Sequence, residues 1–389
     1  MRKGSCGLWG MLPLVLTWAL AFDAPQAEAD MKALLTNGPR VAGTPAASQA
    51  AEYLAAELRK VGYTVEFMPF SYTRTRDLGS SLSVGSANLQ ANAIAGSPAR
   101  RLEAPLTPVP NQGRAEDYTG LDVQGSIVVV RRGGIPFLEK ARIAAERGAV
   151  GLIVVNNGPG NVRGTFGGIG PIPTVTVSQE EGEPLFGQAG ARAFLDVRSV
   201  TEEVQGRDVI AKRGTALPQA VVGAHYDSVP GALGANDNGS GTVTVLGLAR
   251  ELAQSPISER TWFVWFDGEE DGLWGSRRFV EQNQELVQGL RAMLNLDMVG
   301  VNVGGSLGIG GSSSLQALAD CNSVQVSCGS AAEGGSDHLP FAQAGVPVLF
   351  FFRGLDPNYH KPGDTLYDVN LLADTAKVVR GILEGLFRP

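Results

Sequence analysis

Metal-binding side chains follow several apolar runs of this sequence. Only three histidines occur in 389 residues, and two of them lie after apolar runs. His225 follows the apolar run 220–224, and His360 lies in the loop after the run 346–351. Acidic residues occupy comparable positions after other apolar runs or in a glycine-rich turn: Asp237, Glu269, Glu270 and Asp297. Nitrogen and oxygen ligands without thiolate suit zinc, and manganese or cobalt could fill the same set.

These acids would repel one another if they met without a cation. Like charges at short range raise the pKa values of carboxyl groups and destabilise a fold. No lysine or arginine stands among them to relieve that repulsion. We therefore expect a pair of divalent metal ions, of the kind that lie about 3.5–4 Å apart and share one carboxylate.

The segments that must position these residues alternate between strands and helices. Near-continuous apolar runs are typical of strands buried on both faces of a parallel-rich sheet. The runs are 220–224, 261–266, 292–296 and 346–351. The clearest helices are 242–254 and 371–387. Because ligands of open α/β sheets bind beyond the carboxyl ends of strands, we expect a three-layer αβα domain whose central sheet is mixed and mostly parallel.

The chain before and between these segments has a different character. Thr44, Pro45 and a glycine stop predict an amphipathic helix, and a strand is expected at 64–73. From 78 to 205, short apolar strands flank a helix, and this stretch has no histidine or cysteine. We therefore expect the chemistry to lie elsewhere. The glycine- and serine-rich run 304–314 is interpreted as a connecting loop.

The N-terminus is typical of a secretory signal peptide. Arg2 and Lys3 precede an uncharged, apolar stretch that ends in a small-x-small pattern at residues 19–21. We assign residues 1–21 to the signal and expect a secreted or periplasmic protein. An uncleaved anchor is the alternative, although Pro13 interrupts the stretch. No later segment is long enough to cross a membrane, so no stable span is expected after cleavage.

The cysteines and the charge give two further expectations. Removal of the signal leaves Cys321 and Cys328, and an even pair in an exported chain favours a disulfide. Their spacing matches no zinc-knuckle pattern, and two free, buried thiols are the alternative. The net charge of −7 offers no basic footprint, so we expect no nucleic-acid partner. The oligomeric state stays open.

Six motifs of this chain, in this order, resemble those of the exported double-zinc aminopeptidases, the co-catalytic zinc exopeptidases, that carry an inserted protease-associated (PA) domain. They are AHYDS, GANDNGSG, DGEEDGLWGS, NLDMVG, GSDHLPF and YHKPGD. The resemblance covers almost all of the mature chain. It implies a discontinuous zinc peptidase domain at 22–77 and 206–389, with a smaller, β-rich α/β PA domain at 78–205. It also implies peptide substrates with a free N-terminus.

The resemblance implies a ligand set for two zinc ions. Asp237 is implied to bridge both ions. His225 and Asp297 would bind one ion, and Glu270 and His360 would bind the other.

The resemblance also implies two catalytic residues. Glu269 would be the general base that takes a proton from a metal-bridging water and passes it to the leaving amine. The hydroxyl of Tyr359 would donate a hydrogen bond to the tetrahedral oxyanion.

Four more polar residues are expected to support the site. Asp227 would orient the imidazole of His225. Asp337 and His338, in GSDHLPF, are expected to lie behind the ligands or in the pocket wall. Asp364 is expected to be a turn residue or a partner of a ligand.

Three other functions remain open on the same scaffold. A carboxypeptidase or dipeptidase would need an arginine for the substrate carboxylate, and Arg277, Arg278 and Arg353 are available. A glutaminyl cyclase would use one zinc and lack a partner histidine, which His225 argues against. A receptor-like binding module would have lost ligands that this chain retains.

Overall fold

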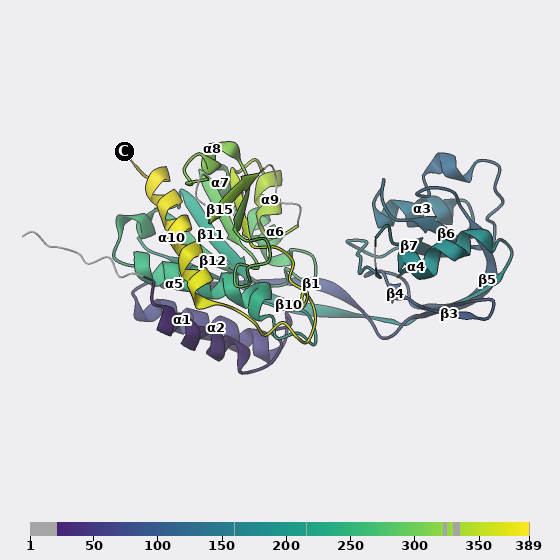
Figure 1. The fold of residues 1–389 in the computed structure, drawn as a ribbon, viewed down its shortest axis with the longest axis horizontal. Coiled ribbons are helices and arrows are strands. Elements are labelled where there is room, and N and C mark those ends of the chain that lie inside the picture. Colours follow the sequence, from purple (N-terminus) through teal and green to yellow (C-terminus); the bar gives the residue numbers. More distant parts are fainter. Residues whose placement is uncertain (1–21, 159, 215, 322–324, 330–334, 389) are drawn as a thin grey trace, which may run out of the picture. The chain divides into compact units, whose positions relative to one another are not determined.

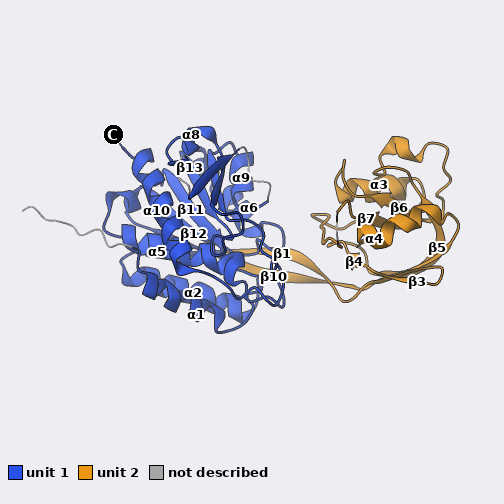
Figure 2. Ribbon diagram, viewed as in Figure 1, with its two compact units in different colours: residues 1–68, 207–389 blue, residues 69–206 orange. Residues whose placement is uncertain are grey.

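The chain folds into two compact units (Figures 1 and 2). The computed structural model describes residues 22–158, 160–214, 216–321, 325–329 and 335–388. The first unit takes the chain up to residue 68 and from residue 207 onward, and the second takes residues 69–206. The insert predicted at 78–205 falls inside the second unit, whereas the predicted signal peptide, 1–21, lies outside the described residues.

An eight-stranded mixed sheet forms the centre of the first unit. In spatial order its strands are β1 (Thr64–Asp77), β10 (Ser199–Lys212), β12 (Thr261–Phe266), β11 (Ala220–His225), β13 (Ala292–Leu296), β16 (Val348–Phe352), β14 (Leu307–Gly311) and β15 (Val326–Gly329). The four strands β12, β11, β13 and β16 pair in parallel. β10 and β14 pair antiparallel at either side of them. The predicted mixed, mostly parallel sheet is confirmed.

Helices cover both faces of this sheet and complete three layers (Figure 1). The helices of the first unit are α1 (Ala24–Leu35), α2 (Pro45–Lys60), α5 (Gly241–Leu252), α6 (Trp274–Gln282), α7 (Gln284–Gln288), α8 (Ser313–Gln316), α9 (His338–Gln343) and α10 (Val369–Leu386), with short turns η3 (Ala235–Ser240) and η4 (Pro256–Glu259). Val222 joins the core under α1, α2, α5 and α10, and its neighbour Val221 joins the core under α6, α7 and α9. Adjacent residues of one strand thus serve opposite cores. Among the described helices, none has the length and apolar character needed to cross a bilayer.

The start of α2 is where the sequence predicts it. The Thr44 side chain accepts a hydrogen bond from the backbone N–H of Ala47 at 3.4 Å, and Pro45 is the first helical residue. The cap satisfies one of the free amides of the first turn, and proline at this position loses no hydrogen bond.

The run 304–314 contains a strand, so its interpretation as a connecting loop is wrong. β14 pairs antiparallel with β16 and in parallel with β15. Glycine carries no side chain that could show a strand pattern, and this strand is formed by backbone pairing with its neighbours.

The second unit has its own eight-stranded sheet with helices on both faces. In spatial order the strands are β3 (Ala87–Gln90), β2 (Ser81–Val84), β9 (Arg192–Val197), β5 (Arg100–Pro108), β6 (Ile127–Arg131), β7 (Gly151–Val155), β8 (Thr174–Val177) and β4 (Asn92–Ala93). Its helices are α3 (Phe137–Glu146) and α4 (Gln179–Gly182), with turns η1 (Ala115–Tyr118) and η2 (Glu183–Gly187). The chain enters this unit through β1 and leaves it through β10, which are hydrogen-bonded neighbours. The predicted α/β insert with a high strand content is confirmed.

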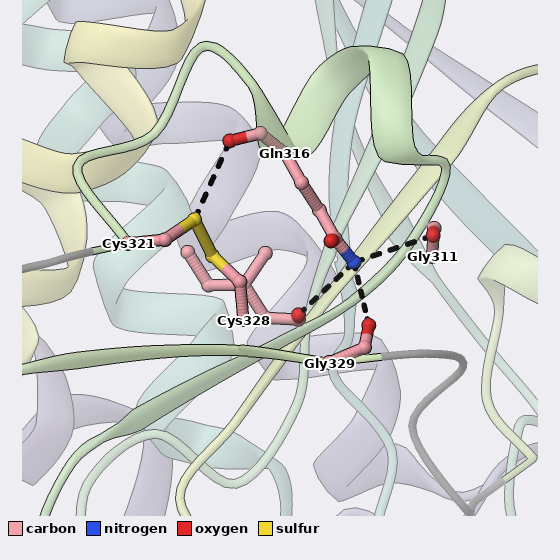
Figure 3. Close-up of a disulfide and its surroundings, with 6 residues drawn as sticks. Gly311, Gln316, Cys321, Cys328 and Gly329 are labelled. Carbon is pink, nitrogen blue, oxygen red and sulfur yellow. Dashed lines mark hydrogen bonds between the residues drawn. A yellow bond between two sulfur atoms is a disulfide. The ribbon is translucent and has the colours of Figure 1, made fainter.

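A disulfide joins Cys321 to Cys328, as predicted (Figure 3). Beside it, the side-chain amide of Gln316 donates to the backbone carbonyls of Gly311 at 3.3 Å and Gly329 at 2.6 Å. The amide therefore ties the end of α8 to the ends of β14 and β15.

Replacing both cysteines by serine is expected to lower the free energy of unfolding by about 2 kcal/mol, because the disulfide restricts the unfolded chain over a short loop. The bridged residues are 7 apart in sequence. Denaturant unfolding of the two proteins measures the difference. Reductant should destabilise the wild type to the level of the variant and leave the variant unchanged; equal stability of both proteins under oxidising conditions would contradict the expectation.

Candidate metal centre

Residues from four strand ends meet at one edge of the main sheet. His225 is the last residue of β11, Glu269 and Glu270 follow β12, and Asp297 follows β13 directly. His360 lies in the loop after β16. Because these four strands are parallel neighbours, their carboxyl ends lie at the same edge, where open α/β sheets bind ligands.

Asp237 lies between the two histidines. Its Oδ1 is 3.3 Å from Nε2 of His225, and its Oδ2 is 3.2 Å from Nε2 of His360. Asp237 lies in η3, directly before α5, and its peptide bond to Asn238 is cis. One carboxylate therefore faces both imidazoles through different oxygen atoms.

The remaining carboxylates divide between the two imidazoles. Nε2 of His225 is 3.5 Å from Oδ1 of Asp297 and 3.9 Å from Oε2 of Glu269. Nε2 of His360 is 3.0 Å from Oε2 of Glu270. Two ligands of a tetrahedral zinc ion are about 3.4 Å apart, so most of these separations match edges of a coordination tetrahedron. Two groups of described residues have ligand atoms within 4.8 Å of one another: His225, Asp237 and Glu270, and His225, Glu269 and Asp297.

Several atoms that face the centre are buried without a hydrogen bond. In the part of the chain that the structure describes, these are Nε2 of His225, Oδ2 of Asp237, Oε1 of Glu270 and Oδ1 of Asp297. A buried polar atom without a partner costs about 1–3 kcal/mol, and more when it is charged. Because all four atoms belong to predicted ligands, bound cations would supply the missing partners. The donor set present here therefore fits a metal centre.

Burial and neighbouring charges shift the pKa values of the cluster. Burial, with the charge of Asp237, raises the pKa of Glu270 to about 8. Burial lowers the pKa of His360, but the carboxylates of Asp237 and Glu270 outweigh it and the pKa is about 10. Acids this close cannot all ionise without positive charge among them. Protonated imidazoles or metal ions can supply that charge.

Asp227 holds three groups of the centre at once. Its Oδ1 is 3.4 Å from Nδ1 of His225. Its two carboxylate oxygens accept hydrogen bonds from the backbone N–H groups of Glu269 at 3.2 Å and Glu270 at 3.3 Å. The buried carboxylate thus orients an imidazole and fixes the loop after β12 relative to β11, which is the kind of support that metal ligands usually have.

Two other residues, farther along the chain, contact predicted ligands. Asp364 accepts hydrogen bonds from the backbone N–H groups of Asn236 at 2.8 Å and Asp237 at 3.1 Å. Ser336 donates from its hydroxyl to Oδ2 of Asp297 at 2.7 Å. Ser336 was not among the predicted site residues, although its position beside Asp337 in GSDHLPF is a signal that could have identified it.

Tyr359, Asp337 and His338 lie around the centre. Like the predicted ligand His360, they belong to neither of the two groups of described residues. The Tyr359 ring stacks on His360 with ring centroids 3.8 Å apart. Asp337 is fully buried, and burial raises its pKa to about 7. His338 stacks on Phe350 at 4.6 Å, and burial lowers its pKa to about 4, so its imidazole is neutral at neutral pH.

Two residues of the centre adopt a strained backbone. His360 has φ of +58°, and Met298, next to Asp297, has φ of +55°. Residues other than glycine rarely occupy this left-handed region, which costs of the order of 1–3 kcal/mol and is often found at functional sites. Contacts around the two loops must maintain these conformations.

The fold and the site together define an α/β protein with a candidate metal centre at the carboxyl edge of its main sheet. The sequence model of Peptidase family M28 matches residues 208–382, and that of the PA domain matches residues 102–185. The probable lipoprotein aminopeptidase LpqL of Mycobacterium tuberculosis is 31% identical, over 87% of this chain and 78% of that protein. The chain therefore belongs to Peptidase family M28 and carries a PA domain.

Solved structures agree with this assignment. The aminopeptidase from Aneurinibacillus sp. strain AM-1 superposes with a TM-score of 0.85, at 30% identity and 95% coverage of both chains. BSAP, a zinc aminopeptidase from Bacillus subtilis, gives a TM-score of 0.72 at 29% identity, covering 94% of this chain and 96% of its own. The family resemblance and the fold class drawn from the sequence are both confirmed.

Proposed function

We propose that this protein is an exported di-zinc aminopeptidase that removes residues from the free N-terminus of peptides. The observation that carries the proposal is the carboxylate of Asp237, which faces both His225 and His360 while each imidazole faces further carboxylates. The aminopeptidase names of the relatives, and the zinc named for BSAP, support the reaction and the metal.

In this proposal each ion has its own ligands. Asp237 would hold both ions, with His225 and Asp297 on one and Glu270 and His360 on the other. Manganese or cobalt could occupy the same oxygen and nitrogen donors. When bound, zinc lowers the pKa of a water to about 7 and polarises the scissile carbonyl.

The proton is moved by Glu269. Burial and the charges of neighbouring acids raise the pKa of its carboxyl group well above the ordinary range, against the lowering effect of His225. A carboxylate is most effective as a general base when its pKa lies near the operating pH, and bound cations would lower this raised pKa toward that range. Oε2 of Glu269 takes a proton from the attacking water and returns it to the leaving amine, while Asp227 holds the backbone of Glu269 in place.

Tyr359 stabilises the developing oxyanion. Its ring stacks on His360, which fixes it beside the ligands. From that position its hydroxyl donates to the oxygen that gains negative charge when the peptide carbonyl is attacked.

Export and domain boundaries complete the proposal. Residues 1–21 act as a signal peptide, and the mature chain is secreted or periplasmic; the word lipoprotein in the name of LpqL supports export. The zinc peptidase domain consists of 22–77 and 206–389, and the PA domain of 78–205.

Aminoacyl-anilides with free and with acetylated N-termini test the proposal. The purified protein is expected to cleave only the free series and to contain two zinc ions per chain, and a chelator should abolish cleavage until zinc is restored. Cleavage of the acetylated series would exclude the proposed aminopeptidase activity. One metal per chain together with cyclisation of N-terminal glutamine would favour a glutaminyl cyclase, and release of C-terminal residues would favour a carboxypeptidase.

A further inference from the structure

Arg40 is a fully buried cation in the loop between α1 and α2, outside all six motifs. Its exposed fraction is 0%. Nε donates to the carbonyl of Tyr226 at 2.7 Å, Nη1 to that of Leu233 at 2.7 Å and Nη2 to that of Gly234 at 2.9 Å. Every nitrogen of the guanidinium is therefore bonded to the backbone of one of two segments.

Those two segments carry proposed metal ligands. Tyr226 follows His225 at the end of β11, and Gly234 directly precedes η3, which contains Asp237. The backbone of Arg40 adds to the link, since its N–H donates to Oγ of Ser228 at 2.9 Å and its carbonyl accepts from the N–H of Ser228 at 3.2 Å. The two segments are thus joined through one residue.

The turn is shaped for this close approach. Gly234 has φ of +65°, and a Cβ there would lie 3.2 Å from Nη2 of Arg40 and 2.4 Å from the carbonyl oxygen of Asp237. Glycine adopts this conformation without strain and leaves room for the guanidinium.

Stability alone does not account for a charge at this place. Within the described residues no carboxylate forms an ion pair with Arg40 at 4.0 Å or less. Burial lowers its pKa to about 10 against the field of four acids, Asp227, Asp364, Asp237 and Glu270. Moving a cation out of water is costly, and replacing a whole buried ion pair by apolar residues is often neutral or stabilising, so a buried charge is weak evidence of a role in stability. The planar guanidinium of Arg40, whose donors point in fixed directions, can instead hold the two segments in a fixed geometry.

We propose that Arg40 is a positioning residue for the metal centre. Its guanidinium holds the segment after His225 and the segment before Asp237 at a fixed separation, so that imidazole and carboxylate bind the same ion. The inference rests on the proposed function, because it requires that these side chains bind metal.

The test compares the zinc affinity of folded variants by competition with a chelating dye. Arg40→Met keeps much of the side-chain volume and removes the donors, and we expect zinc affinity to fall about 10–100-fold, as for other residues that orient ligands. Arg40→Lys keeps the positive charge but loses the planar guanidinium, and we expect its zinc affinity to fall roughly 10-fold. Hydrolysis by the zinc-saturated variants is a second readout.

Arg250→Met is the matched control. Arg250 lies on α5 with 15% of its side chain exposed and pairs with Asp30 and Glu57. Its replacement should lower the melting temperature and leave zinc affinity unchanged, which separates loss of stability from loss of positioning.

Each outcome decides the matter. Wild-type zinc affinity in folded Arg40→Met would overturn this proposal alone. If Arg40→Met does not fold, wild-type affinity in Arg40→Lys would overturn it. A wild-type chain that binds no zinc would overturn the proposed function and this inference together.

Discussion

Changing Glu269 to glutamine is expected to reduce turnover by roughly two to four decades while zinc content stays near two ions per chain. Glutamine has nearly the same shape and cannot take up a proton, and general base catalysis contributes about 10²–10⁴-fold. Asp227 binds the backbone N–H of Glu269 rather than its side chain, so the loop should keep its position. Steady-state kinetics on a free aminoacyl-anilide, with metal analysis of the same sample, measure both quantities.

The adjacent Glu270→Gln variant is the control for Glu269→Gln. Glu270 is proposed to be a ligand, since its Oε2 is 3.0 Å from Nε2 of His360, so its replacement should lower the metal content as well as turnover. Loss of both metals from Glu269→Gln, with normal content in Glu270→Gln, would show that the roles of base and ligand are exchanged.

Asp237→Asn is expected to lose zinc affinity by roughly two to three and a half decades, and turnover should fall with it. The amide would turn an N–H₂ group toward one of the two imidazoles and would lack the negative charge. Removing one partner from a buried charged group costs roughly 3–5 kcal/mol, and each 1.4 kcal/mol is one decade. Metal content after gel filtration and hydrolysis of the free anilide are the measurements.

Asp30→Asn serves as the control for Asp237→Asn. Asp30 is also buried, but its carboxylate pairs with Arg250 in the packing of α1 against α5. Replacing Asp30 should lower the free energy of unfolding and leave the zinc content unchanged. Full zinc content in Asp237→Asn would remove Asp237 from the ligand set.

Much of the fold and of the candidate centre could be predicted because both leave a local signal. The strands β11, β12 and β13 are near-continuous apolar runs, so the acids and the histidine at their ends could be found as candidates by position, and the family resemblance implied their roles. β14 was missed because a glycine-rich strand has no side-chain pattern. Arg40 and Ser336 were missed because their contacts are with segments distant in sequence. The acceptors of the Arg40 guanidinium are backbone carbonyls, which place no demand on the identity of the residue that carries them.

The way the second unit is attached bears on how this architecture arose. Its entry and exit strands, β1 and β10, are hydrogen-bonded neighbours in the sheet of the first unit, so its two attachment points lie together as in a β-hairpin. Without the PA domain, a tight turn would be enough to join these two strands. Acquisition or loss of the whole module in evolution therefore amounts to exchanging one turn, with the catalytic core left intact.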